Sequence, residues 1–107
     1  MDKRMKYIIV FVTAPKRETK KIINILLTKK LVACVNEIKN IDSYYWWENK
    51  ICVDKESLLI IKTKKMLFKK LLQEIKKVHP YKVPEVISVD IKNGNKEYFD
   101  WINSVTL

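Results

Sequence analysis

The feature that most constrains the fold is the order in which two kinds of hydrophobic periodicity alternate. Residues Tyr7 to Thr13 are β-branched and aromatic, which is typical of a buried strand. From Glu18 to Lys30 apolar residues recur at helical spacing, and the same spacing returns from Leu67 to His79. Further strand-like runs are predicted at 31–46, 51–63 and 86–91, and a short final helix at 97–104.

The resulting order is strand, helix, strand, strand, helix, strand. Right-handed crossovers then predict an α+β fold, the ferredoxin-like βαββαβ sandwich, in which an antiparallel four-stranded sheet carries both helices on one face. The second and third strands are longer than the core needs, so we expect an extended, projecting hairpin. The polar interruption around Asn40 indicates a bend or bulge. Asn49 and Gly94 are the expected left-handed residues of the two tight turns.

Length and composition predict one domain over residues 1–107, because 107 residues with 48% hydrophobic content support a single core. The net charge of +10 raises nucleic acid or an anionic membrane as partners. Most lysines, however, form doublets beside apolar residues at helical spacing, which is typical of the solvated faces of amphipathic helices. The charge is therefore read mainly as a solvated surface.

Two cysteines, Cys34 and Cys52, lie in apolar strand-like runs without CxxC spacing. We expect buried, reduced thiols, which favours an intracellular protein. The charged segment 1–6 precedes an apolar run that is too short for a signal peptide, and no segment approaches transmembrane length. A soluble, cytoplasmic protein without membrane contact is predicted.

Four consecutive aromatic residues, Tyr44, Tyr45, Trp46 and Trp47, lie near the tip of the predicted hairpin. Exposing four rings on a projecting ribbon is costly, and a chain this small has little else to cover them. We therefore expect an oligomer. In the alternative interpretation, strand alternation turns one or two of these rings into the core of the monomer.

The segment His79-Pro80-Tyr81-Lys82-Val83-Pro84-Glu85 places an imidazole, a phenol and a carboxylate on a rigid helix-to-strand connection. Each proline fixes its own φ and favours an extended conformation in the residue before it, so His79 should close the helix. Polar groups with a defined direction are suited to a binding site. A stiff connection without any ligand is the alternative.

Several of these motifs occur together in a known order. The matching segments are Thr13-Ala14-Pro15 with Glu18, Leu31 to Asn36, Ser43 to Trp47 with Lys50-Ile51, Glu56 with Leu58 to Thr63, His79 to Glu85, and Tyr98 with Trp101. From Thr13 to Trp101 this pattern resembles the CutA family of divalent-cation tolerance proteins. The resemblance implies a ferredoxin-like subunit, a compact homotrimer with edge-to-edge hairpins, and a cytoplasmic role in tolerance of copper and other divalent ions.

The resemblance also implies places for individual residues: a cleft between subunits approached by Cys34, Glu56, His79, Tyr81 and Glu85, with Trp47 beside it, and a trimer interface with Tyr44, Tyr45, Trp46 and Trp101. Some family members bind copper through a cysteine before the Thr-Ala-Pro turn and through a histidine doublet. Val12 and Val78 stand at those positions here, and only His79 remains. A copper site of that type is incomplete in this sequence.

The remaining groups have two interpretations. Imidazole and carboxylates suit Cu²⁺ or Zn²⁺, so His79 with Glu85, joined by Glu56, forms a weak metal site. Alternatively, His79 caps its helix against the C-terminal dipole while Glu85 pairs with a lysine. Neither interpretation requires a cofactor. The metal-site interpretation allows Cu²⁺ or another divalent cation as the ligand.

Enzymatic activity is not expected, because the chain has one glycine, no phosphate-binding loop and no nucleophile-base arrangement. Two alternatives to a metal-associated trimer stay open. The first is a small-molecule-sensing or scaffold trimer, and the second is a nucleic-acid-binding module that uses the open sheet face. The inner strands lack the Lys/Arg-Gly-Phe pattern of the second class, so we do not expect nucleic acid as the partner.

Overall fold

A computed structural model describes residues 5–107, so residues 1–4 of the predicted charged N-terminal segment lie outside the described part. The elements follow the predicted order. They are β1 (Tyr7–Ala14), α1 (Lys16–Thr28), β2 (Cys34–Trp47), β3 (Lys50–Lys64), a 3-10 turn η1 (Lys65–Leu67), α2 (Phe68–Val78), β4 (Val86–Asp90) and α3 (Lys96–Val105).

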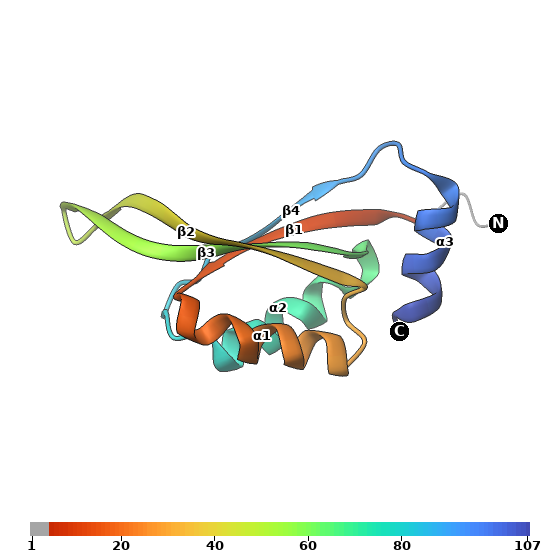
Figure 1. The fold of residues 1–107 in the computed structure, drawn as a ribbon, viewed down its shortest axis with the longest axis horizontal. Coiled ribbons are helices and arrows are strands. Elements are labelled where there is room, and N and C mark those ends of the chain that lie inside the picture. The colour runs from red at the N-terminus through yellow and green to blue at the C-terminus, as the bar shows by residue number, and fades with distance from the viewer. Residues whose placement is uncertain (1–4) are drawn as a thin grey trace.

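The strands form one antiparallel sheet in the order β2-β3-β1-β4. Helices α1 and α2 lie against the same face of this sheet, and α3 lies at the end opposite the hairpin tip (Figure 1). This arrangement confirms the predicted ferredoxin-like α+β fold. Within residues 5–107, no helix has both the length and the apolar character needed to cross a membrane.

Strict alternation in β1 places its even-numbered residues in the core. Ile8, Val10 and Val12 are fully buried between the sheet and the helices, where they pack with buried residues of β3, α1 and α2. Because successive side chains of a strand point to opposite faces, the odd-numbered residues of β1 face away from the helices. The two helices therefore cover one face of the sheet, and both faces of the sheet are apolar.

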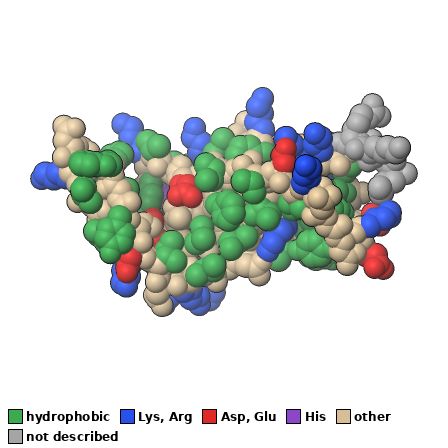
Figure 2. Space-filling view, turned by 90° about the horizontal axis from the view of Figure 1, so that it is seen from above, with side chains coloured by type: hydrophobic (Ala, Val, Ile, Leu, Met, Phe, Trp, Pro, Cys, Tyr) green, Lys and Arg blue, Asp and Glu red, His purple; other side chains and the backbone are tan. Residues whose placement is uncertain are grey.

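The face that the helices leave uncovered, the open face, is apolar along its centre. Phe11 of β1 pairs with Ile60 of β3 on one side and with Ile87 of β4 on the other. Cross-strand partners share a face, so these three side chains lie together. Figure 2 views the molecule from this side and shows hydrophobic side chains over much of the middle, with most of the basic side chains nearer the edges.

A bulge interrupts the pairing of β2 with β3. The register changes between Ile38 and Ile41, and Asn40 in this interval has a left-handed backbone with φ 61°. Asparagine tolerates this conformation better than most residues. The predicted irregularity at Asn40 is confirmed, and beyond it the two strands continue as the hairpin that projects from the body in Figure 1.

The hairpin ends in a two-residue turn. Trp47 pairs with Lys50, and the two residues between them, Glu48 and Asn49, have φ angles of 49° and 62°. Positive φ at both central positions is the requirement of a type I′ turn, whose twist matches that of the flanking strands. The prediction for Asn49 is confirmed. No turn signal marks Glu48, because glutamate is a poor residue for a positive φ.

Two expectations about small residues are wrong. Gly94 does not have a positive φ; instead, a Cβ atom there would lie 2.5 Å from Cζ of Phe99, so the glycine is required by the close approach of that ring. The thiols of Cys34 and Cys52 are unpaired, as predicted, but both residues are partly exposed rather than buried. Both occupy positions of the β2–β3 hairpin that the helices do not cover.

Candidate functional site

A pocket lies where the hairpin meets the connection between α2 and β4. Its volume is about 630 Å³, within the range of sites for small ligands. The residues around it come from three parts of the chain: Thr13 at the end of β1; Ser43, Tyr44, Tyr45, Trp46, Trp47 and Glu56 on the hairpin; and Tyr81, Lys82, Val83 and Glu85 on the connection.

His79 closes α2 and anchors the connection. Its backbone N–H donates to the carbonyl of Ile75, and the backbone of His79 itself is extended, as the proline pattern predicts. The buried ring is bonded on both sides: Nε2 lies 2.8 Å from the carbonyl oxygen of Thr13, and Nδ1 accepts the N–H of Tyr81 at 3.0 Å. This pattern is that of a neutral imidazole protonated at Nε2.

Tyr81 is held by His79 and in turn reaches Glu56. Its ring lies 4.8 Å from the imidazole ring, and its hydroxyl donates to Oε2 of Glu56 at 2.7 Å. Burial raises the pKa of the Tyr81 phenol above its usual value, and the hydrogen bond to Glu56 raises it further. The phenol therefore stays protonated and serves as a donor to the carboxylate.

Glu56 is the most unusual residue of the pocket. Only 5% of its surface is exposed, although β1 ends at Ala14 and leaves it at the margin of the sheet. Among residues 5–107, no lysine or arginine forms an ion pair with this carboxylate. A carboxylate that is nearly fully buried without a cationic partner is unfavourable. A positively charged group next to Glu56 would therefore be stabilising.

The four aromatic residues of the hairpin remain largely uncovered within the chain. Tyr44 and Trp46 are 72% and 71% exposed, and Tyr45 and Trp47 are 40% and 51% exposed. The alternative in which one or two of these rings enter the core of the monomer is therefore wrong. Beyond the sheet body, the hairpin has no helix beneath it, so strand alternation has no core to point toward (Figure 1).

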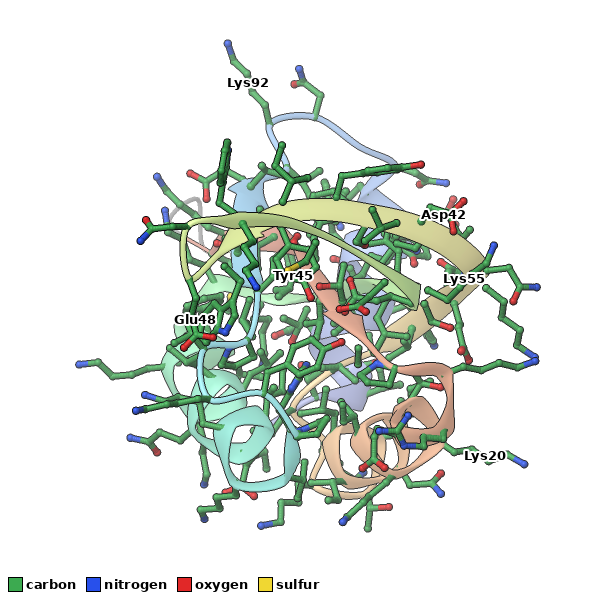
Figure 3. The ribbon with its side chains drawn as sticks, turned by 90° about the vertical axis from the view of Figure 1, so that its left-hand side faces the viewer. Lys20, Asp42, Tyr45, Glu48, Lys55 and Lys92 are labelled. Atoms are coloured by element: carbon green, nitrogen blue, oxygen red, sulfur yellow. The ribbon has the colours of Figure 1, made fainter. Side chains whose placement is uncertain are left out.

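Tyr45 makes a contact that sequence reasoning missed. Its hydroxyl donates to a carboxylate oxygen of Asp54 on the neighbouring strand, and this hydrogen bond raises the pKa of Tyr45 to about 12. In Figure 3, seen from the hairpin end, Tyr45 lies toward the centre of the view, whereas Lys20 and Lys92 extend outward. A turn at 48–49 sets the pairing of Tyr45 with Cys52, which makes Asp54 the diagonal neighbour. The predicted turn was therefore the sequence signal from which the contact between Tyr45 and Asp54 could have been found.

Two of the predicted site residues lie elsewhere. Cys34 begins β2, and its proximity contributes to the raised pKa of Tyr98 in α3, after the larger effect of burial. Trp101 packs against the same tyrosine at 5.4 Å between ring centroids and is 41% exposed. Within one chain, Cys34 and Trp101 therefore form a separate cluster at the α3 end, away from the pocket.

The metal-ligand set can be tested on the donors that the fold brings together. Glu56 and Glu85 both line the pocket, whereas the two ring nitrogens of His79 already have backbone partners. Across residues 5–107, no group of three or more His, Cys, Asp or Glu side chains is arranged to hold a metal ion. A single chain therefore supplies two carboxylates, one of which already accepts from Tyr81, and this is fewer ligands than a strong Cu²⁺ or Zn²⁺ site has.

The fold and the pocket define a class: a small ferredoxin-like α+β protein with a projecting aromatic hairpin and a carboxylate-bearing pocket at its base. Residues 8–105 match the family described as CutA1 divalent ion tolerance protein. The chain belongs to this CutA1 family, as the sequence motifs predicted.

Individual relatives agree with the assignment. The chain is 38% identical over 99 residues to the divalent-cation tolerance protein CutA of Thermus thermophilus, covering 92% of this chain and 96% of that one. It is 45% identical over 100 residues, 92% of its length, to the chloroplastic protein CutA 1 of Oryza sativa. The chain spans 56% of that rice protein and 58% of the chloroplastic CutA of Arabidopsis thaliana. The crystal structure of CutA1 from Oryza sativa superposes with a TM-score of 0.92 at 44% identity, covering 95% and 94% of the two chains.

Proposed function

We propose that this protein acts in divalent-cation tolerance as a cytoplasmic homotrimer that binds a cation weakly in a cleft between subunits. The cleft is the pocket around Glu56 and Glu85, closed by a neighbouring copy. The observation that carries the proposal is the buried carboxylate of Glu56, which has no cationic partner among residues 5–107.

Assembly is supported by the apolar surface that one chain leaves in water. On the open face, Ile38, Ile87 and Val89 are 46%, 55% and 49% exposed, and they adjoin the partly exposed Phe11 and Ile60. The hairpin adds its four exposed rings. Contiguous apolar patches of this kind mark interaction surfaces. Self-association covers both patches at once, and closed symmetry is the usual outcome for a single type of chain.

A divalent cation at the cleft is supported by the two carboxylates, with water or groups from the neighbouring copy completing its coordination. His79 joins the ligand set only if its ring gives up a backbone hydrogen bond, since Nδ1 is bonded to the Tyr81 N–H and Nε2 to the Thr13 carbonyl. In the arrangement described, His79 is a positioning residue for Tyr81. This makes Glu56 and Glu85 the primary candidates for Cu²⁺ or another divalent ion.

A binding role rather than a catalytic one is supported by the pocket chemistry. The buried imidazole is bonded on both sides, and the hydroxyls of Tyr45 and Tyr81 each donate to a carboxylate. A cytoplasmic location is supported by the unpaired cysteines, since thiols persist in reducing compartments.

The experiment combines mass in solution with metal titration. Light scattering should give three copies per particle, and Ile87→Lys, which places a charge on the open face, should reduce the mass. Ser88→Lys is the matched control, because Ser88 pairs with Val10 and so belongs to the opposite face of the same strand. A wild-type protein that scatters as a single folded chain at working concentration contradicts the assembly.

Calorimetric titration with Cu²⁺ tests the site. Binding should be saturable and should be lost in Glu56→Gln, while Glu97→Gln, a carboxylate of α3 outside the pocket, should bind normally. His79→Ala should weaken binding by displacing Tyr81. Equal binding by all variants contradicts a site at the pocket.

A further inference from the structure

We propose that the same pocket binds a primary alkylammonium group, with Glu56 as the acceptor of its N–H donors and the aromatic rings of the hairpin around its alkyl chain. The inference rests on the proposed function in one respect: the pocket must remain a cleft in the assembled protein. It goes further by naming a class of organic ligand that a metal site does not require.

The charge requirement comes from Glu56. Its Oε2 accepts from the hydroxyl of Tyr81, a neutral donor that leaves the carboxylate charge uncompensated. Glu85 adds a second carboxylate to the lining, and Lys82 is the one basic residue there. In a chain whose net charge is +10, this pocket therefore carries an excess of negative charge.

The rings specify the kind of cation. Tyr44, Tyr45, Trp46, Trp47 and Tyr81 all line the pocket. Aromatic faces attract ammonium groups and bury alkyl chains, with cation–π contributions of about 0.5–2 kcal/mol. A hydrated metal ion gains little from such walls and asks for several oxygen, nitrogen or sulfur ligands. Among the described residues, no three His, Cys, Asp or Glu side chains are grouped to hold such an ion.

A primary ammonium fits better than a quaternary one. A carboxylate that is 95% buried needs hydrogen-bond donors as well as a positive charge, and its exposed fraction of 5% leaves little room for water. A primary ammonium supplies three N–H donors in a compact group. A quaternary ammonium supplies none and leaves Glu56 without a donor beyond Tyr81.

This chemistry has two possible sources: a free amine, or a lysine side chain of a second copy inserted into the pocket. The free amine is tested with protonated n-butylamine, and uncharged n-butanol at the same ionic strength is the matched control. Binding is read from tryptophan fluorescence, since Trp46 and Trp47 line the pocket. Saturable binding of the amine and none of the alcohol is expected.

Two variants locate the binding. Glu56→Gln keeps an acceptor for Tyr81 and should weaken amine binding about tenfold or more, because one partner of a buried charge pair is lost. Glu85→Gln is at an exposed position and should weaken it severalfold without risk to the fold. Glu97→Gln should bind like wild type. Circular dichroism checks that each variant is folded.

The second arm uses zero-length carbodiimide coupling, which joins a lysine amine to a carboxylate in contact with it. If a coupled peptide links Glu56 to a lysine of another copy and no amine binds, the ammonium group in the pocket is that lysine. Absence of both amine binding and such a link overturns the inference. Cu²⁺ binding without amine binding and without such a link overturns the inference and leaves the proposed function intact. Amine binding without Cu²⁺ binding supports the inference and contradicts cation binding in the proposed function.

Discussion

The hydroxyl of Tyr81 donates a 2.7 Å hydrogen bond to Oε2 of Glu56, and this bond joins the connection after α2 to strand β3. The backbone N–H of the same tyrosine donates to Nδ1 of His79. One residue thus transmits the position of a buried imidazole to a buried carboxylate. The geometry of the pocket depends on this link, because Glu56 belongs to the hairpin and Tyr81 to the connection before β4.

Removing this hydroxyl should destabilise the protein. Tyr81→Phe leaves the buried carboxylate of Glu56 with one fewer donor, so the free energy of unfolding should fall by about 1–3 kcal/mol. Urea denaturation at fixed protein concentration measures the change. Tyr44→Phe removes a hydroxyl from a ring that is 72% exposed and should have little effect. Equal stability of the Tyr81 variant and the wild type contradicts the role of the bond.

Substitution of Gly94 tests the contact with Phe99. In Gly94→Ala the new methyl group would lie 2.5 Å from Cζ of the ring, so the ring must move and its stacking on Tyr7, at 4.6 Å, must change. Overpacking of this kind costs about 1–3 kcal/mol. Thermal unfolding measures the loss. Because the backbone of Gly94 is not left-handed, Phe99→Leu should reduce the penalty of the alanine, and a penalty that persists in full would contradict this cause.

The hairpin turn offers a stabilising change. Glu48 has a φ of 49°, a conformation that glycine adopts without steric cost. Glu48→Gly should therefore stabilise the protein by about 0.5–1 kcal/mol, provided that the strain relieved exceeds the added entropy of the unfolded chain. Lys39→Gly, in strand β2 and without a positive φ, has no such benefit and serves as the control. A lower melting temperature for Glu48→Gly than for wild type contradicts the prediction.

Alkaline pH should weaken the hairpin and the pocket. Hydrogen bonding to Asp54 raises the pKa of Tyr45 to about 12, and burial followed by bonding to Glu56 raises that of Tyr81. A raised pKa in the folded state favours the protonated phenol, so its stabilising effect is complete below the unfolded value of about 10. It is lost as the pH rises through the folded value.

Ultraviolet absorbance of tyrosinate follows these titrations. Both phenols should ionise at higher pH in the folded protein than after unfolding, and Asp54→Asn should move the Tyr45 transition to lower pH. Tyr44, which remains in Asp54→Asn, provides an internal reference with a ring that is 72% exposed. An unchanged Tyr45 transition in Asp54→Asn would show that another group controls this phenol.

Acid pH should weaken the contact between the two helices. Lys29, just after α1, donates to Glu74 of α2 at 2.8 Å, and Lys77 donates to the other oxygen at 3.0 Å. Both bonds lower the pKa of Glu74, and the bond from Lys29 has the larger effect. A lowered pKa gives stability that is present above the unfolded value and is lost as the pH falls through the folded one.

The Glu74 carboxyl resonance reports this titration directly. Lys29→Met should raise the pH at which Glu74 is protonated more than Lys77→Met does, and Lys70→Met, on the same helix, should leave it unchanged. The reverse order for Lys29 and Lys77 would contradict the assignment of Lys29 as the main partner.

The order of elements was predictable because periodicity reports local environment directly. The buried alternation of β1 and the apolar spacing of both helices identified the fold, and Asn40 and Asn49 marked the two irregular points of the hairpin. Glu48 was missed because a residue that is unsuited to positive φ carries no turn signal. Gly94 was misread because its constraint comes from Phe99, five residues later, rather than from its own backbone.

The site was less predictable than the fold. His79, Tyr81, Glu85 and Glu56 were named from the sequence, and the pocket brings the last three together. Burial of Glu56 could not be foreseen, because it depends on where β1 ends and on how Tyr81 packs across it. The bonding of both His79 nitrogens depends equally on tertiary contacts, with Thr13 lying 66 positions earlier in the chain.

The bulge at Asn40 sets how the residues of β2 are shared between the two faces of the sheet. Its unpaired residue shifts β2 by one step, so even-numbered positions before it, and odd-numbered positions after it, share the face of Phe11. Because β3 runs through this region without interruption and the turn at 48–49 fixes the distal pairs, deleting the extra residue would leave Tyr45 opposite Cys52 and would only straighten the ribbon. The spare amino acid therefore sets the direction in which the aromatic tip is aimed, and the faces of its rings are independent of it.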